Sequence, residues 1–261
     1  MPSPIFDFFE VIAEELCAEE SRVITRPDLL ANKEQAPLLD ALKREMKAST
    51  TEDAIRLCVE ALEAHFAERA AKLPFTYDPT SGRFTVVDAE YLKFVVAMAS
   101  IRSVGKKSKD FELGVLERLK LRAAGSLHRV GHPRDRFPQK HGFNEYLKLL
   151  GFQNSVLLGQ DKDGGFDILW LLPLGPRSHR PIVSVQCKNG MFNMGEGDKS
   201  VGAATRSLAQ HGGLQPTVHV PCVMYNDYVT AKLLTPKALN FLPLGLTDLA
   251  ALSSLITAEA I

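Results

Sequence analysis

The chain has 261 residues, of which 45% are hydrophobic and 24% are charged, and its formal net charge is zero. This composition is that of an ordinary globular protein and excludes collagen-like and intrinsically disordered classes. No stretch reaches the roughly 18 uninterrupted apolar residues of a membrane-spanning helix, and the N-terminus lacks the cationic and apolar regions of a secretory signal. We therefore expect a cytoplasmic protein without a membrane partner, built as one large domain or as a core with an extension.

The charged residues are unevenly distributed along the chain. Residues 1–80 carry about seven net negative charges, whereas residues 102–148 carry about seven net positive ones. A basic region of this kind is consistent with a surface that contacts phosphate, and equally with ordinary solvated surface. The four cysteines are widely separated and form no Cys-x-x-Cys pair, so we expect reduced thiols and no zinc or redox motif.

The N-terminal part of the chain shows helical periodicity. Apolar residues recur at spacings of three and four across residues 5–73, which is the pattern of amphipathic helices. The segment 49–53, Ser-Thr-Thr-Glu-Asp, predicts an N-cap within this region. A short strand is predicted over residues 84–87, followed by a helix that Asp88 caps and that runs through residue 101. We assign residues 1–101 to a helical N-terminal region that serves docking, dimerisation or support of DNA binding.

Residues 102–261 form the second predicted domain, and its first part is rich in basic residues. We expect the segment 102–109 to be flexible and residues 127–142 to form an inserted basic loop, because Gly131 and Pro133 disfavour a helix there. Phosphate or DNA-groove contact and an ordinary polar surface both fit the basic loop. The predicted nucleic-acid contacts, which include one lysine from a later glycine-rich segment, are Lys106, Lys107, Lys109, Arg129, Arg134, Arg136 and Lys199.

Two apolar runs further along the chain have the character of β-strands. Residues 164–170 and 181–188 are separated by a turn segment that contains proline and glycine. In the second run, side-chain alternation places Gln186 and Lys188 on one face, roughly 7 Å apart along the strand. A lysine in a buried strand needs a partner, unless its side chain extends to solvent. The nearest carboxylate is Asp167, and an Asp, an amide and a Lys so arranged suit a Mg²⁺ site that activates water.

These strands resemble the motif of the PD-(D/E)XK nuclease superfamily, in the variant where Gln replaces the second acid, as in Mrr-like restriction endonucleases. The resemblance rests on Asp163-Gly164-Gly165-Phe166-Asp167-Ile168 followed by Val185-Gln186-Cys187-Lys188. It implies an α/β fold with a restriction endonuclease-like core, a mixed sheet flanked by helices in the order helix, strand, strand, strand, helix, strand. Residues 154–158 and 218–225 are predicted strands of this core, and Pro221 indicates an edge or a bulge.

The resemblance also implies roles for the motif residues. Asp167, the Gln186 side chain and the Cys187 carbonyl would bind Mg²⁺, and Lys188 would orient the attacking water and offset charge on the phosphorane. In this family an earlier helix supplies a third acidic group. Glu112 and Glu145 both fit that position. For Glu112, an equal explanation is that a carboxylate is stabilised near a helix N-terminus. The implied catalytic set is therefore Asp167, Gln186, Lys188, Glu112 and Glu145.

The function implied by the resemblance is a Mg²⁺-dependent endonuclease that hydrolyses double-stranded DNA in restriction or phage defence. Cutting both strands favours a homodimer. The glycine-rich segment 189–200 only approaches a nucleotide-binding P-loop, so we interpret it as a mobile loop that enters a helix over residues 200–210. An ATPase or specificity partner would therefore be a separate protein. Two alternatives stay open: a DNA repair or recombination nuclease, and a catalytically lapsed module that binds DNA or a partner.

Overall fold

A computed structural model describes residues 3–18, 23–105, 108–122, 126–129, 167–171, 182–210, 219–228, 240–249 and 251. The chain is of the α/β class and divides into two compact units, Met1–Val104 and Gly105–Ile261. The boundary anticipated from the sequence, after residue 101, lies three residues before the boundary between these units. In the described part of the chain, no helix is long and apolar enough to cross a membrane.

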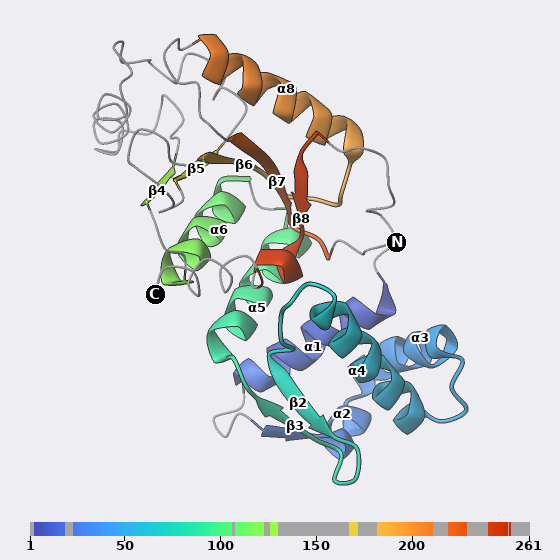
Figure 1. The fold of residues 1–261 in the computed structure, drawn as a ribbon. Coiled ribbons are helices and arrows are strands. Elements are labelled where there is room, and N and C mark those ends of the chain that lie inside the picture. Colours follow the sequence, from blue (N-terminus) through green and yellow to red (C-terminus); the bar gives the residue numbers. More distant parts are fainter. Residues whose placement is uncertain are drawn as a thin grey trace. The chain divides into compact units, whose positions relative to one another are not determined.

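Unit 1 combines helices with a small antiparallel sheet (Figure 1). Its strands are β1 (Val23–Thr25), β2 (Phe75–Asp78) and β3 (Arg83–Val86), hydrogen-bonded in the order β1-β3-β2. Its helical segments are α1 (Pro4–Ala18), α2 (Arg26–Ala31), η1 (Lys33–Gln35), α3 (Ala36–Met46), α4 (Thr51–Ala67) and α5 (Ala89–Ser103). The core is aromatic: Phe9 of α1 lies 5.6 Å from Phe66 of α4 and 6.0 Å from Phe75 of β2, measured between ring centroids.

Two helix starts in unit 1 confirm the predicted caps. The Thr50 side chain accepts a hydrogen bond of 3.1 Å from the Asp53 N–H at the start of α4. The Asp88 carboxylate accepts one of 2.9 Å from the Tyr91 N–H at the start of α5. Each bond satisfies a backbone donor that the first helical turn leaves without an intrahelical acceptor. The predicted strand at residues 84–87 also forms, as β3.

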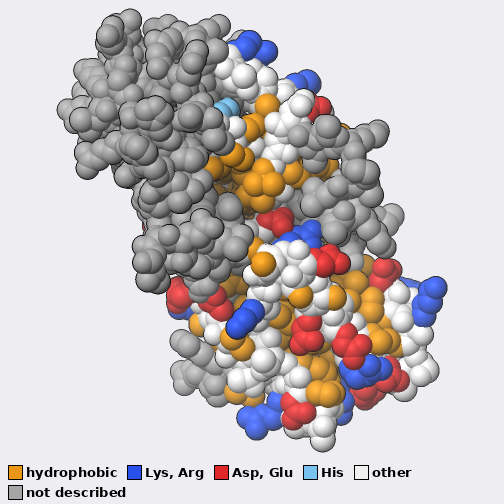
Figure 2. Space-filling model, in the orientation of Figure 1, with side chains coloured by type: hydrophobic (Ala, Val, Ile, Leu, Met, Phe, Trp, Pro, Cys, Tyr) orange, Lys and Arg blue, Asp and Glu red, His pale blue; other side chains and the backbone are white. Residues whose placement is uncertain are grey.

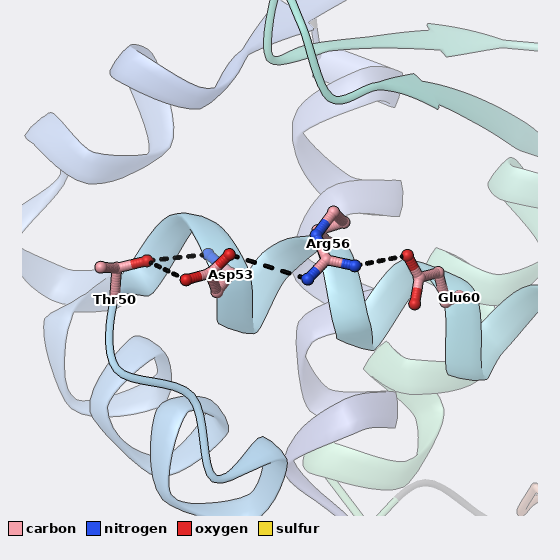
Figure 3. A network of polar contacts seen from close by, with 4 residues as sticks. All are labelled: Thr50, Asp53, Arg56 and Glu60. Carbon is pink, nitrogen blue, oxygen red and sulfur yellow. Dashed lines mark hydrogen bonds and ion pairs between the residues drawn. The ribbon is translucent and has the colours of Figure 1, made fainter.

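The outward face of α4 is acidic. Figure 3 shows Thr50, Asp53, Arg56 and Glu60 along this face, where Arg56 lies 2.7 Å from Glu60 and 3.7 Å from Asp53. Glu52, Glu60 and Glu63 are exposed. Ion pairs as exposed as these contribute little to stability. The acidic residues, however, make this face unsuitable for phosphate contact.

Unit 2 contains a mixed sheet with a helix on each face (Figure 1). The described strands are hydrogen-bonded in the order β4-β5-β6-β7-β8; β4, β5 and β6 are antiparallel neighbours, whereas β6, β7 and β8 are parallel. Helix α6 contacts β4 and β6, and helix α8 contacts β7. The elements are α6 (Ser108–Arg122), β4 (Ser126–Arg129), β5 (Ile168–Leu171), β6 (Ile182–Lys188), α8 (Met194–Gln210), β7 (His219–Tyr225) and β8 (Leu242–Leu244).

Two segments of unit 2 differ from the sequence-based prediction. The basic loop predicted from residue 127 begins as a strand, because β4 pairs with β5 through the backbone whatever its side chains are. Helix α8 begins at Met194, earlier than the predicted residue 200. Its first turn is stabilised by the Asn193 carboxamide, which accepts a bond of 3.0 Å from the Gly195 N–H, and by Glu196 near the positive end of the helix. The strand predicted at residues 154–158 lies outside the described residues.

Pro221 lies within β7, which has a neighbouring strand on each side. The Asn226 N–H bonds to β6, so even-numbered residues of β7 direct their backbone groups towards β6 and odd-numbered ones towards β8. The nitrogen of Pro221 therefore faces the β8 side, where pairing begins only at Cys222. Pro221 therefore interrupts no ladder bond, but the predicted edge or bulge is wrong, because β7 is an internal strand with a continuous register to β6.

The first prediction concerns the pH dependence of unit 1. Burial, together with the nearby Arg69 guanidinium, lowers the pKa of His65 from 6.5 to about 4. The folded state binds this proton less tightly than the unfolded state, so stability is lost as the pH falls from 6.5 towards 4. Between pH 7 and pH 4.5, we expect the wild type to lose on the order of 1–2 kcal/mol more stability than His65→Leu, after allowing for solvent screening. Urea unfolding of the full chain at both pH values measures this difference, and an equal loss in the two proteins would contradict the assignment.

The second prediction concerns the packing of α8 on the sheet. A Cβ at Gly197 would lie 2.2 Å from the buried Phe241 ring, whereas one at Gly195 would lie 3.5 Å from Asn193 Oδ1, an ordinary contact. Gly197→Ala should therefore destabilise unit 2 by about 1–3 kcal/mol. Gly195→Ala, the matched control in the same helix, should be neutral or gain up to about 1 kcal/mol from helix propensity. Thermal unfolding distinguishes them, and equal transition temperatures would refute the close approach.

Candidate active site

The first strand of the predicted motif begins at a buried carboxylate. Asp167 precedes β5, and its N–H donates to the Val185 carbonyl of β6 at 2.8 Å. Next along the chain, Ile168 is paired directly with Val185 in the antiparallel register. Asp167 is only 5% exposed. A carboxylate at such a position needs hydrogen-bond donors to offset the loss of its hydration.

Strand β6 supplies those donors. The Asp167 Oδ2 atom accepts a hydrogen bond from the Cys187 N–H at 2.6 Å and one from Gln186 Nε2 at 2.5 Å. Hydrogen bonds to a carboxylate are shorter and stronger than those between neutral groups. The side chains of Asp167 and Gln186, which the sequence separates by 18 residues, therefore meet directly at the start of β5.

The backbone of β6 brings a further oxygen to the same edge. The Val185 carbonyl is directed towards β5, where it accepts from Asp167, and the Lys188 carbonyl is directed towards β7, where it accepts from Asn226. Backbone groups alternate in direction along a strand, so the Cys187 carbonyl is directed towards β5. The Asp167 carboxylate, the Gln186 carboxamide and the Cys187 carbonyl thus share one side of the strand end.

The register of the parallel strands fixes the face on which Gln186 and Lys188 project. Gln186 is paired with Val223 and Lys188 with Tyr225. Paired residues of neighbouring strands project to the same face of a sheet. Val223 and Tyr225 belong to a buried cluster with Val201 of α8, so this is the face that α8 covers. Gln186 is buried and Lys188 is half-buried, and their register partners confirm the prediction that both project to one face.

The amide at position 186 changes the electrostatics of the pair. Two carboxylates in contact would repel, and one would bind a proton at neutral pH. The Gln186 amide instead donates to Asp167. A cation at Asp167 Oδ2 would compete with that N–H, and half a turn of the amide would present Oε1 to the cation in place of Nε2.

The chemistry of these donors suits a hard cation. Carboxylate, carboxamide and carbonyl oxygens are the ligands that Mg²⁺ prefers, and Mg²⁺ is commonly held by one or two carboxylates while it keeps several waters. Within the described ranges, no group of three His, Cys, Asp or Glu side chains forms a metal site. The described oxygens therefore fit a site with one carboxylate, completed by water or substrate.

A second polar pair lies on the same face of β6. Ser184 Oγ is 2.7 Å from His219 Nε2 of β7, and Ser184 is only 2% exposed. Burial lowers the pKa of His219, which favours the neutral ring. Ser184, Gln186 and Lys188 form a polar row along an otherwise apolar strand. Sequence alternation indicates that Ser184 belongs to this row, whereas the contact with His219 depends on strand order and could not be read from spacing.

The remaining predicted residues are distributed over several elements. Glu112 is half-buried on α6, on the face of the sheet opposite α8. Lys109 of α6 and Lys199 of α8 are exposed. Arg129 is the last residue of β4, and its side chain is outside the described set. The residues that lie outside the described ranges are Lys106, Lys107, Arg134, Arg136 and Glu145.

Comparisons with known proteins give no family. No protein-family model matches the chain, and no curated protein matches its sequence. Among solved structures, a crystal structure of protein VC1899 from Vibrio cholerae is similar with a TM-score of 0.25 and 13% sequence identity. The match covers 98% of this chain and 51% of that chain, so this chain spans about half of its length. A TM-score of this size does not indicate a shared fold.

The third prediction tests the contact between Asp167 and Gln186. Gln186→Glu places a second carboxylate against Asp167, and we expect the metal-free protein to lose on the order of 3 kcal/mol of stability near neutral pH. Mg²⁺ should restore part of this loss by binding both carboxylates. Gln186→Leu, the control, loses the hydrogen bond but gains no ligand, and Mg²⁺ should leave its melting temperature unchanged. Equal Mg²⁺ responses of the two variants in thermal unfolding would show that no cation binds between these side chains.

Proposed function

We propose that the chain is a Mg²⁺-dependent endonuclease that hydrolyses double-stranded DNA, of restriction or phage-defence type. The observation that carries the proposal is the contact between Asp167 and β6. The Asp167 carboxylate accepts from both Gln186 and Cys187, and Lys188 follows as the next residue of the same strand. These are the residues of the predicted Gln-x-Lys motif.

The order of elements in unit 2 supports the same proposal. The described elements follow the chain as α6, β4, β5, β6, α8 and β7, which is a helix, three strands, a helix and a strand. Three strands form an antiparallel meander and β7 lies parallel to β6. This succession of described elements agrees with the order that the resemblance implies, with β4 in place of the strand predicted at residues 154–158. The active residues then lie on its second and third strands.

In the proposed mechanism, the residues at the end of β6 act on the scissile phosphate. Asp167, the Gln186 carboxamide and the Cys187 carbonyl would hold Mg²⁺, which would supply Lewis-acid chemistry by lowering the pKa of a water and polarising the phosphate. Lys188, half-buried at the strand end, orients the water through its ammonium group. The same ammonium offsets the negative charge that builds up on the phosphorane.

The predicted nucleic-acid contacts all lie in unit 2, whose helices α6 and α8 carry exposed charges of both signs, among them Asp110, Glu117, Glu196 and Asp198. Exposed lysines lie on α6 (Lys109) and on α8 (Lys199). The outward face of α4 in unit 1 carries exposed glutamates, and Figure 2 shows acidic and basic side chains mixed on the surface of that unit. Unit 1 suits docking or dimerisation better than phosphate contact. A homodimer would present two sites to the two DNA strands, with an ATPase or specificity protein as a further partner.

One observation favours a second candidate, a lapsed module that binds DNA or a partner without cutting. The Gln186 amide donates to the Asp167 carboxylate, so a neutral group of the chain itself offsets the burial of this charge. A site stabilised in this way does not need a metal to fold. Metal titration separates the two functions, because a lapsed module binds DNA without Mg²⁺ and leaves it intact.

The fourth prediction tests the nuclease directly. Purified protein is incubated with supercoiled plasmid and either Mg²⁺ or EDTA, and we expect cutting only with Mg²⁺. Lys188→Ala should slow cutting by about 10²–10³-fold, as for the loss of one preorganised donor. Asp167→Asn removes the only carboxylate of the described oxygen set and should slow it at least as much. Lys93→Ala, which removes an exposed lysine paired with Glu90 on α5, is the control and should cut normally. Wild-type rates in both site variants would exclude the mechanism.

A further inference from the structure

Strand β6 ends at Lys188, and the chain then leaves the sheet to enter α8. The Gly190 N–H donates to the Lys188 carbonyl at 2.9 Å, which forms a tight turn directly after the strand. A strand end at such a turn is a region of low local stability unless further contacts hold it. The position of the Lys188 ammonium depends on how this end is held.

Asn226, the residue that follows β7, contacts this strand end twice. Its N–H donates to the Lys188 carbonyl at 3.0 Å. Its side-chain Nδ2 donates to Asn189 Oδ1 at 2.7 Å. Asn226 is fully buried, with 0% of its surface exposed.

The two contacts differ in what they require of the residue. The first is the last rung of the parallel ladder and forms with any residue except proline. The second requires a side-chain donor of this length. A buried amide lowers the stability of the fold by about 1–3 kcal/mol unless its hydrogen bonds are made. A local contact must therefore explain why an asparagine stands at position 226. That contact is the bond to Asn189, the residue that directly follows Lys188.

The far end of the same loop is also held by β7. The Tyr225 hydroxyl donates to the Asn193 carbonyl at 3.0 Å, and burial raises the pKa of Tyr225 to about 12, so the hydroxyl keeps its proton. Tyr225 is the register partner of Lys188. Two successive residues, Tyr225 at the end of β7 and Asn226 directly after it, thus hold both ends of the segment 189–193.

We propose that Asn226 is a positioning residue for Lys188. Its carboxamide holds Asn189, and through the backbone this sets the direction in which the Lys188 side chain leaves the strand. The inference rests on the proposed nuclease function, in which the lysine ammonium must meet a water and a phosphate. A displacement of about 1 Å in such a group can cost on the order of 10²-fold in rate.

The test measures single-turnover plasmid cutting at saturating Mg²⁺. Asn226→Ala keeps the backbone bond and removes the side-chain bond, and it should cut about 10- to 100-fold more slowly, as for the loss of a supporting contact. Asn189→Ala should have a similar effect, and Asn189→Asp, which keeps the acceptor for Nδ2, should recover most of that loss. The control is Ser200→Ala, which removes another buried bond of unit 2, to the Glu196 carbonyl at 2.9 Å, and should cut normally.

A double variant separates positioning from general destabilisation. In the Lys188→Ala background there is no ammonium to position, so Asn226→Ala should cause no further loss of rate. Amide hydrogen exchange should also increase in residues 187–193 of Asn226→Ala and remain unchanged in Ser200→Ala. Wild-type cutting by Asn226→Ala, or a further loss of equal size in the Lys188→Ala background, would overturn the inference while the nuclease proposal stands. Absence of cutting by the wild type would instead reject the nuclease proposal, and the positioning role with it.

Discussion

The buried carboxylate of Asp167 is the group on which the end of the β5–β6 pair depends. It cannot be buried without donors, and both described donors to Oδ2 come from β6. The same interaction therefore fixes the two strands relative to each other and gathers the oxygens of the site. Because the Cys187 N–H donates to the side chain of Asp167, a substitution of Asp167 alters both the pairing of β5 with β6 and the oxygens of the proposed site. Replacement by Asn, which keeps an acceptor, separates these effects better than replacement by Ala.

The other side of β6 is fixed by contacts that contain no catalytic group. Because residue 197 is a glycine, the Phe241 ring can occupy the space that a Cβ would take, and α8 packs closely on the sheet. The cluster of Val201, Val223 and Tyr225 then holds β7 under the helix. Asn226 connects this packed region to the strand end through its bonds to the Lys188 carbonyl and to Asn189. In the proposed nuclease, the apolar core of unit 2 would thus determine where the Lys188 ammonium lies, as a rigid scaffold does for a functional site.

Sequence periodicity predicted the features that depend on neighbours along the chain. The caps at Thr50 and Asp88 and the shared face of Gln186 and Lys188 follow from local spacing, and the structure confirms them. Features that depend on strand order could not be predicted in this way. Asn226 lies 37 residues from Asn189, so nothing in the local sequence indicates their contact. Strand β4 was missed because its pairing uses backbone groups, whereas its side chains are those of a polar loop.

The amide of Gln186 limits how tightly the proposed site could hold a cation. In the proposed site, Mg²⁺ would displace the Gln186 N–H from Asp167 and would gain a neutral oxygen in return, so the chain alone would bind it more weakly than a pair of acids. A bound DNA phosphate would supply the charged oxygens that the chain lacks. In the proposed nuclease, metal and DNA would therefore bind cooperatively, because each completes the ligand set of the other. The hydrogen bond from Gln186 to Asp167 would then also be the reason why metal binding depends on bound DNA.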